Sequence, residues 1–283
     1  MAFVQIGEHS VFYRERGSGP PVVFCHGWPL DSREFTRQLD GLSDAYRVIA
    51  WDAPGAGRST DPSDETTLDD WADWLAELVH ALDLGTIHLA GLSWGGGLAL
   101  AFADRHPGLV RSLVLMSAYA GWGGSLPEDE VRRRLELTMA NTSQAPEEWV
   151  PATLDTLLPP GSSSHLADEL WAMLSDLHPG ATRTALRAFA EADLRPALGR
   201  IDAPALLLYG DRDVRSPRAV REPIHEAIPG STLVVLPGMG HMVDMQAPRA
   251  LQRRDQGVPR HRRAGATAGE ETGGDRAGAA AGS

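Results

Sequence analysis

The chain has 283 residues, a formal net charge of −12 and a hydrophobic fraction of 42%. This length suits one large α/β domain, and the apolar content supports a sizeable core. The negative charge argues against nucleic-acid binding, which requires a basic surface. No segment reaches the roughly 18 consecutive apolar residues of a membrane helix, and residues 1–5 lack a signal-peptide pattern. We therefore expect a globular cytoplasmic protein that binds neither nucleic acid nor a membrane.

Two residue counts exclude further chemistry. The chain contains no lysine, which excludes a Schiff-base enzyme and a P-loop nucleotide site, because both need the amine. The single cysteine, Cys25, excludes an internal disulfide and a cysteine-rich metal site. Cys25 lies in an apolar run, and we expect a buried structural thiol. No His, Asp and Glu residues follow a metal-ligand spacing, so we expect neither a metal nor a cofactor.

In chain order, the predicted elements alternate between strands and helices. Residues 3–6 and 11–16 are typical of an antiparallel hairpin at the edge of a sheet. Apolar and β-branched runs predict further strands at 22–25, 47–51, 86–90, 113–117, 205–209 and 232–236. Helical periodicity begins at residue 68, after a capping box of Thr67 and Asp70, and again at residue 94. This alternation indicates an α/β fold with a mainly parallel sheet.

The alternation is interrupted between residues 122 and 195. This interval holds several prolines, no convincing strand and short helical patterns such as 128–138 and 166–174. We interpret it as a helical cap inserted after the sixth strand. The predicted organisation is a first core part, a cap, a second core part and a tail, at residues 1–121, 122–195, 196–250 and 251–283.

The predicted tail differs from the rest in composition. Val258 is the only large aliphatic or aromatic residue after Leu251, and most of the remainder is Arg, Gly, Ala, Glu and Thr. Such a segment buries too little apolar surface to offset the entropy of ordering. We therefore predict that it is largely disordered.

A serine surrounded by glycines, in the stretch Gly91-Leu92-Ser93-Trp94-Gly95, is the first candidate for chemistry. A strand precedes it and a helix rich in small residues follows, which is the form of a nucleophile elbow. The serine would be strained at the sharp turn, and the glycines would let strand and helix approach closely. Helix N–H groups would then face a developing oxyanion. On its own, the stretch is also compatible with an ordinary tight turn.

The remaining parts of a serine site follow later strands. A serine hydroxyl needs a histidine base, which a carboxylate orients. Strand 205–209 leads to Asp211 and Asp213, and strand 232–236 leads to Gly240-His241. Asp213 fits the spacing better, whereas Asp211 is typical of a turn. Together with the loop 26–29, which can supply a second N–H donor, these pieces favour catalysis over a simple turn.

These motifs, with His26-Gly27-Trp28-Pro29 and residues 51–59, resemble the α/β-hydrolase superfamily. The resemblance is greatest to its small cap-bearing esterase, lactonase and cofactor-free haloperoxidase or perhydrolase branch, and it covers about residues 3–248. It implies an eight-stranded, mainly parallel sheet flanked by helices, with a helical cap. It also implies a catalytic triad of Ser93 as nucleophile, His241 as base and Asp213 as orienting acid.

The same resemblance implies an oxyanion hole formed by the backbone N–H groups of Trp28 and Trp94. The cap would select the substrate. Aromatic and methionine side chains are candidate pocket residues, although they also suit a core within the insertion: Trp122, Met139, Trp149, Trp171 and Met242. A serine nucleophile disfavours haloalkane and epoxide chemistry, for which relatives use aspartate.

One feature departs from the family pattern. An apolar helix normally follows the catalytic histidine, whereas here residues 245–249 begin suitably and the composition then changes to that of the tail. The sequence therefore does not predict the full helix that normally packs behind the histidine.

The expected function is hydrolysis of a small, mostly apolar carboxylic ester or lactone through an acyl-enzyme, without a cofactor. Two alternatives use the same triad, namely perhydrolysis with hydrogen peroxide and hydrolysis of a C–C bond. A third alternative is a ligand-binding or signalling member of the fold in which hydrolysis is incidental. The sequence does not specify the natural substrate or the oligomeric state.

Overall fold

The structure is a computed structural model and describes residues 1–252. Its centre is an eight-stranded sheet with the order β1-β2-β4-β3-β5-β6-β7-β8. β1 pairs antiparallel with β2, and β2 with β4, whereas the remaining neighbours are parallel. The strands are β1 Ala2–Ile6, β2 His9–Arg16, β3 Pro21–Cys25, β4 Arg47–Trp51, β5 Ile87–Leu92, β6 Val110–Met116, β7 Ala205–Gly210 and β8 Thr232–Leu236. The eight-stranded, mainly parallel sheet expected from the sequence is confirmed.

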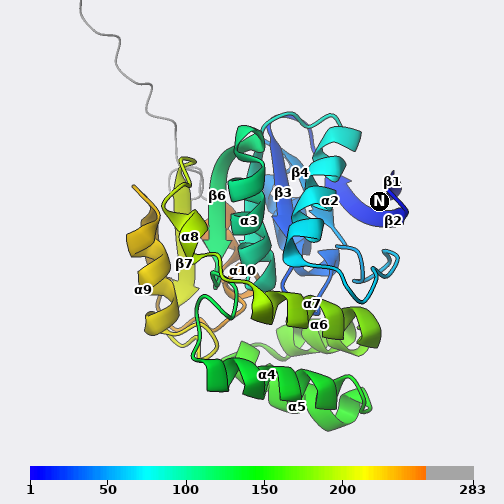
Figure 1. Ribbon diagram of the computed structural model, residues 1–283, viewed down its shortest axis with the longest axis vertical. Helices are drawn as coiled ribbons and strands as arrows, with labels where there is room; N and C mark the ends of the chain where they lie inside the picture. The colour runs from blue at the N-terminus through cyan, green and yellow to red at the C-terminus, as the bar shows by residue number, and fades with distance from the viewer. Residues whose placement is uncertain (253–283) are drawn as a thin grey trace, which may run out of the picture.

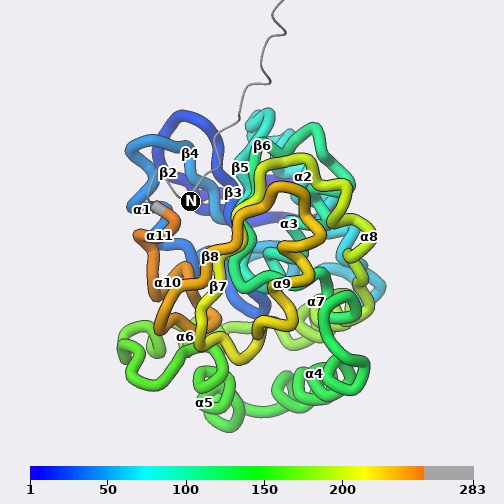
Figure 2. The backbone as a smooth tube through the Cα atoms, turned by 90° about the vertical axis from the view of Figure 1, so that its left-hand side faces the viewer, coloured from blue at the N-terminus to red at the C-terminus, as the bar shows by residue number. Residues whose placement is uncertain are grey.

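Helices cover both faces of this sheet. Figures 1 and 2 show α2, α3, α8 and α9 on one face and α1, α10 and α11 on the other. These helices are α1 Thr36–Leu42, α2 Leu68–Ala81, α3 Trp94–Arg105, α8 Arg195–Leu198, α9 Arg218–Ala227, α10 Val243–Gln246 and α11 Pro248–Gln252, with short 3-10 turns at Ser32–Phe35 and Pro107–Leu109. The predicted capping box is present, because Thr67 and Asp70 exchange hydrogen bonds at the start of α2.

The core consists of two apolar clusters, one on each face. Alternate residues of β3 supply both, since Val23 and Cys25 belong to one cluster and Val22 and Phe24 to the other. This alternation explains why strands buried on both faces are continuous apolar runs. Cys25 is a buried free thiol, as expected, and burial raises its pKa.

The interval after β6 forms a helical cap at the carboxyl ends of the strands (Figure 1). Its helices are α4 Glu128–Asn141, α5 Pro146–Leu157, α6 Ser164–Ser175 and α7 Pro179–Glu191. α4 packs on α7, and α5 packs on α6. The cap is therefore inserted after the sixth strand, as predicted.

The boundary of the predicted tail differs from the expectation. Leu251 and Gln252 belong to α11, and Leu251 is buried against the cluster that contains Phe35 and Leu39. This one apolar residue extends the packed chain beyond residue 250. The rest of the predicted tail, residues 253–283, lies outside the described residues.

Candidate active site

The parallel strands bring distant loops to one edge of the sheet. Cys25 is paired with Gly91, Gly91 with Leu115, and Gly210 with Leu236. β3, β5, β6, β7 and β8 therefore end side by side, beneath the cap. Ligand sites of open α/β sheets lie at this carboxyl edge, and the candidate residues come from the loops that follow these strands.

Ser93 forms a sharp turn between β5 and α3. Its backbone has φ 54° and ψ −110°, a left-handed conformation that strains a residue with a side chain. The turn is held by hydrogen bonds from the Ser93 N–H to the Met116 carbonyl at 2.8 Å and from the Gly97 N–H to the Ser93 carbonyl at 3.1 Å. The surrounding sheet and helix therefore fix the strained serine at the tip of the turn.

Two of the glycines are required by close backbone contacts. A Cβ atom at Gly91 would lie 2.1 Å from the Gly95 carbonyl oxygen, and one at Gly95 would lie 2.2 Å from the Cys25 carbonyl oxygen. No side chain fits at these distances, so only glycine lets α3 begin directly against β5 and β3.

His241 and Asp213 form a buried hydrogen-bonded pair. The His241 Nδ1 lies 2.9 Å and 3.1 Å from the two carboxylate oxygens of Asp213. The carboxylate also accepts hydrogen bonds from the N–H groups of Arg215 and Ser216 and from the Ser216 hydroxyl. Because an ionised carboxylate only accepts, Nδ1 carries the hydrogen and Nε2 is left with a lone pair.

The pKa values of this pair keep the imidazole basic and the carboxylate charged. Burial alone would raise the pKa of Asp213, but the charge of His241 and the hydrogen bonds outweigh it and hold this pKa well below its usual range. Burial lowers the pKa of His241 from 6.5, and Asp213 only partly opposes this effect. Near neutral pH, Asp213 is therefore ionised and His241 is neutral.

The backbone of His241 is fixed from two sides. Its N–H donates to the carbonyl of Leu157 at the end of cap helix α5, at 3.0 Å. Its carbonyl accepts a hydrogen bond from the Ser117 hydroxyl, at the end of β6, at 2.8 Å. Neither Ser117 nor Leu157 could be identified from the sequence, because nothing local in the chain indicates either contact.

Ser93 and His241 line one small cavity of about 40 Å³. Its apolar wall comes from the core and the cap: Leu30, Leu92, Leu157, Leu174 and Met242. Within the described residues, Ser93 Oγ makes no hydrogen bond to His241. Such contacts are often long without substrate and tighten in the reacting complex.

Two backbone N–H groups beside this cavity are unoccupied. Among residues 1–252, neither the Trp28 nor the Trp94 amide donates to another residue. The neighbouring Gly27 amide is instead bound to the Glu34 carboxylate at 2.9 Å. His26 holds the same loop, because its Nδ1 lies 3.1 Å from the Gly27 carbonyl and its Nε2 accepts from the Ala53 N–H. Trp28 and Trp94 are therefore positioned as free donors.

A cluster of aromatic rings lies behind these two donors. The rings of Trp28 and Trp94 have centroids 4.7 Å apart, and Trp71 of α2 packs edge-on against both. This packing of Trp71 supports the loop on which Trp28 lies.

A second, larger cleft of about 610 Å³ lies between the cap and the core. It shares Trp28 and Arg215 with the small cavity. Of the predicted pocket residues, Trp122 and Trp149 line this cleft, and Met242 lines the small cavity. Each of the three is largely buried.

Two predicted pocket residues do not line either cavity. Met139 lies on the outer face of α4 and is 55% exposed, next to Val131 and Leu135. Trp171 packs with the apolar cluster beneath α6, which includes Leu170 and Leu174. Composition alone did not reveal which face of each cap helix is turned toward the cleft.

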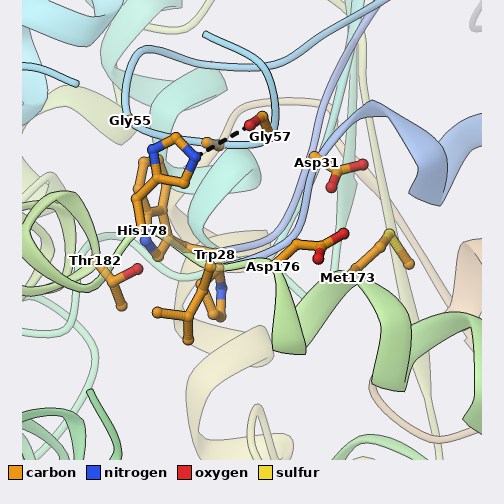
Figure 3. Close-up of a pocket in the computed structure, with 11 residues that line it drawn as sticks. Trp28, Asp31, Gly55, Gly57, Met173, Asp176, His178 and Thr182 are labelled. Carbon is orange, nitrogen blue, oxygen red and sulfur yellow. Dashed lines mark hydrogen bonds between the residues drawn. The ribbon is translucent and has the colours of Figure 1, made fainter. Parts of the chain in front are cut away.

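The cap contacts the core near the loops after β3 and β4 (Figure 3). His178, just before α7, reaches the Gly57 carbonyl with Nε2 at 3.1 Å and the Asp61 carboxylate with Nδ1. Arg33 of the core pairs with Asp176 of the cap at 2.8 Å. Figure 3 shows Asp176, His178 and Trp28 around the same small pocket. Polar contacts at the rim therefore fix the position of the cap.

A pair of acidic side chains is buried beneath the candidate site. Glu34 and Asp244 are fully buried, and their carboxyl groups interact with each other. Burial raises the pKa of Asp244 to about 7. Burial, with the nearby Asp244 charge, raises the pKa of Glu34 well above its usual value. This acidic pair therefore lies next to the loop of Trp28, because Glu34 accepts the hydrogen bond of the Gly27 amide.

Two other kinds of site are absent from residues 1–252. Within this range, no three His, Cys, Asp or Glu side chains gather as metal ligands. No helix in the same range is both long and apolar enough to cross a bilayer.

A comparison with known proteins gives the family of a chain with this sheet, this strained serine and this buried His–Asp pair. Residues 20–248 match the family model described as the alpha/beta hydrolase fold. The chain therefore belongs to the α/β-hydrolase family.

Relatives within this family have several activities. A non-heme chloroperoxidase from Streptomyces lividans is 33% identical, over 82% of this chain and 89% of its own. An (E)-2-((N-methylformamido)methylene)succinate hydrolase from Acinetobacter baylyi is 30% identical, over 83% and 89%. A thermophilic esterase from Thermogutta terrifontis has a similar structure, with a TM-score of 0.82 and 28% identity, over 89% and 96%.

Proposed function

We propose that the protein is a serine hydrolase that cleaves a small, mostly apolar carboxylic ester or lactone. The observation that carries this proposal is one cavity lined by both Ser93 and a His241 whose Nδ1 is bound to Asp213. Membership of the α/β-hydrolase family and a structural relative that is an esterase support it.

The reaction follows from the roles that these groups can perform. The neutral Nε2 of His241 takes the proton of Ser93 as its Oγ attacks the carbonyl carbon. Asp213 keeps the imidazole in the correct tautomer and stabilises its cation. His241 then gives the proton to the leaving alcohol, and an acyl-enzyme remains on Ser93. Water activated by His241 attacks this ester and releases the acid.

The oxyanion of each tetrahedral intermediate would be bound by the amides of Trp28 and Trp94. Both are free to donate, and Trp94 is the first residue of α3, where the helix dipole favours negative charge. Loss of one oxyanion donor reduces kcat by about 10²–10³-fold in serine hydrolases. Because the proposed oxyanion hole uses backbone N–H groups, side chains such as Trp71 affect it only by holding those groups in place.

Hydrolysis of p-nitrophenyl butyrate tests this proposal. The wild type should release p-nitrophenol, and Ser93→Ala should lose at least about 10³-fold of kcat/KM. Ser43→Ala, which removes a hydroxyl that within residues 1–252 bonds only to the Asp40 carbonyl, is the matched control and should behave as wild type. Turnover that survives Ser93→Ala would contradict the proposal, and negligible turnover of a broad ester panel would favour a binding protein.

A second candidate is perhydrolysis, which the relationship to a chloroperoxidase favours. Hydrogen peroxide would then replace water as the nucleophile that attacks the acyl-enzyme and would release a peracid. The wild type incubated with acetate and peroxide would form peracetic acid in a Ser93-dependent way. If ester hydrolysis is present and peracid formation is absent, water is the acceptor.

A further inference from the structure

Arg215 lines both the cavity beside Ser93 and the larger cleft. It lies two residues after Asp213, and its backbone N–H donates to the Asp213 carboxylate at 2.9 Å. Its side chain reaches across to the cap, where Nη1 donates to Thr156 Oγ1 at 3.0 Å. No carboxylate of the described residues lies within 4.0 Å of the guanidinium. The cation at the junction of the two cavities has one neutral partner.

Most of the hydrogen-bonding capacity of Arg215 is free. A guanidinium has five N–H donors in a planar fork, and within residues 1–252 its Nε and Nη2 have no partner. Neither atom is among the unpartnered side-chain atoms that are fully enclosed. These donors are therefore accessible from the cavities that Arg215 lines, and they can receive an acceptor with two oxygens.

The other arginines of the cleft are paired. Arg133 and Arg134 share the Glu130 carboxylate, at 2.8 Å and 2.7 Å. Arg134 also lies over the ring of Tyr119, and both side chains donate to the backbone carbonyl of Arg215. The backbone of Arg215 is thus held from two sides, while its guanidinium forms no ion pair with a carboxylate of the described residues.

A half-buried cation without a counter-ion is unfavourable unless a ligand supplies one. Burial lowers the pKa of Arg215, and the nearby Arg134 charge acts in the same direction, whereas Tyr119 and the Asp213 charge partly oppose them. The whole chain has a formal net charge of −12, so its overall field repels an anionic ligand. A preference for an anionic substrate would therefore have to come from Arg215 itself.

We propose that Arg215 binds a free carboxylate of the substrate while Ser93 attacks its ester carbonyl. This inference rests on the proposed serine hydrolase function and specifies its substrate class, an ester that carries one carboxylate. The planar fork matches a carboxylate in a two-point contact. The leucines and Met242 of the small cavity would contact the carbon chain between the two groups.

The test compares esters that differ in one group. Monomethyl succinate and monomethyl glutarate carry the carboxylate on the acyl side, and acetoxyacetate carries it on the alcohol side. Methyl butanoate, methyl pentanoate and ethyl acetate are the matched neutral esters, with methyl in place of carboxylate. The wild type should have a kcat/KM at least about tenfold higher for one of the anionic esters than for its neutral partner.

Two variants of Arg215 test whether its guanidinium causes the preference for anionic esters. Arg215→Met keeps the length of the stem and removes the charge, and it should reduce the anionic-to-neutral ratio about tenfold or more, mainly through KM. Arg215→Lys should recover part of the ratio, because the charge returns without the fork. Arg218→Met removes an exposed charge three residues further on, bound to Glu222, and should keep the wild-type ratio.

A measurement on the wild type avoids dependence on folding of the variants. Free succinate or glutarate should inhibit hydrolysis of p-nitrophenyl butyrate competitively, and the corresponding diamides should not. Neutral esters turned over by Ser93 with no anionic preference and no inhibition by dicarboxylates would overturn the role of Arg215 alone. Absence of Ser93-dependent turnover of all the esters would overturn the proposed function itself.

Discussion

The His–Asp pair of the core and the ion pairs that join the cap to the core differ in burial. The side chains of His241 and Asp213 are 2% and 0% exposed, whereas those of Arg33 and Asp176 are 44% and 62% exposed. Exposed pairs contribute little and are screened by salt, whereas buried pairs are screened much less. We infer that the proposed catalytic pair stays fixed under conditions that change the position of the cap.

The cap also contacts the backbone of His241 directly. The carbonyl of Leu157 in the cap accepts the N–H of His241. A movement of α5 would therefore shift the backbone of His241, the proposed base. Breaking the exposed ion pairs at the rim would instead mainly change the shape of the cleft. We therefore expect substitutions in the His241–Asp213 pair to change kcat, and substitutions in the ion pairs at the rim of the cap to change KM.

The largest expected effect is that of Asp213→Asn. The amide cannot hold the same tautomer of His241, and a loss of about 10⁴-fold in kcat is expected for such a change. Asp211→Asn is the matched control, because Asp211 is exposed and accepts a hydrogen bond from the Gly238 N–H. Steady-state kinetics should show less than about a threefold effect for the control. Equal losses in both variants would contradict the assignment.

The pH dependence of kcat/KM provides the next test. The lowered pKa of His241 keeps it neutral, and able to accept a proton, below the pH of 6.5 at which an unperturbed imidazole titrates. Activity should therefore be constant through neutral pH and fall on the acid side with a midpoint below 6.5. A midpoint above this value would show that the buried pair does not control the reaction.

The positions of the candidate residues could be predicted from sequence because each lies in a local motif. Ser93, Asp213 and His241 each follow a strand at a recognisable spacing, and parallel strands bring their ends together. Arg215 and the Glu34–Asp244 pair could not be predicted. Their properties depend on which groups lie opposite them in space, and those groups are far away in the chain.

The same reasoning applies to the cap. Its helices were predictable from periodicity and prolines, but the face that each turns toward the core was not. Trp122 and Trp149 line the cleft, whereas Met139 is on the outer face of α4 and Trp171 packs beneath α6. All four are apolar residues of the same insertion, so only tertiary packing distinguishes them.

The buried acidic pair predicts a pH-dependent stability of the core. The raised pKa of Asp244 means that the folded chain binds its proton more tightly, so stability falls as pH rises from 3.8 to about 7. Asp244→Asn removes this penalty and should raise Tm by several degrees at pH 8, but not at pH 4. The exposed Asp202→Asn should have no such effect. A lower Tm for Asp244→Asn at pH 8 would contradict the assigned protonation.

The smallest expected effect is at the rim of the cap. Asp61→Asn removes the carboxylate partner of His178 and should raise KM about two- to fivefold with little change in kcat. Asp40→Asn, which removes an exposed pair with Arg16 on the core, is the control. A kcat effect as large as that of a triad variant would contradict the separation of the two regions.

The central claim is that Ser93 is a nucleophile activated by His241. Labelling with a fluorophosphonate, followed by peptide mass spectrometry, tests it directly. The account predicts one adduct per chain on Ser93 in the wild type at neutral pH, and none in Ser93→Ala. An unlabelled wild type, or an adduct that persists in Ser93→Ala, would contradict it.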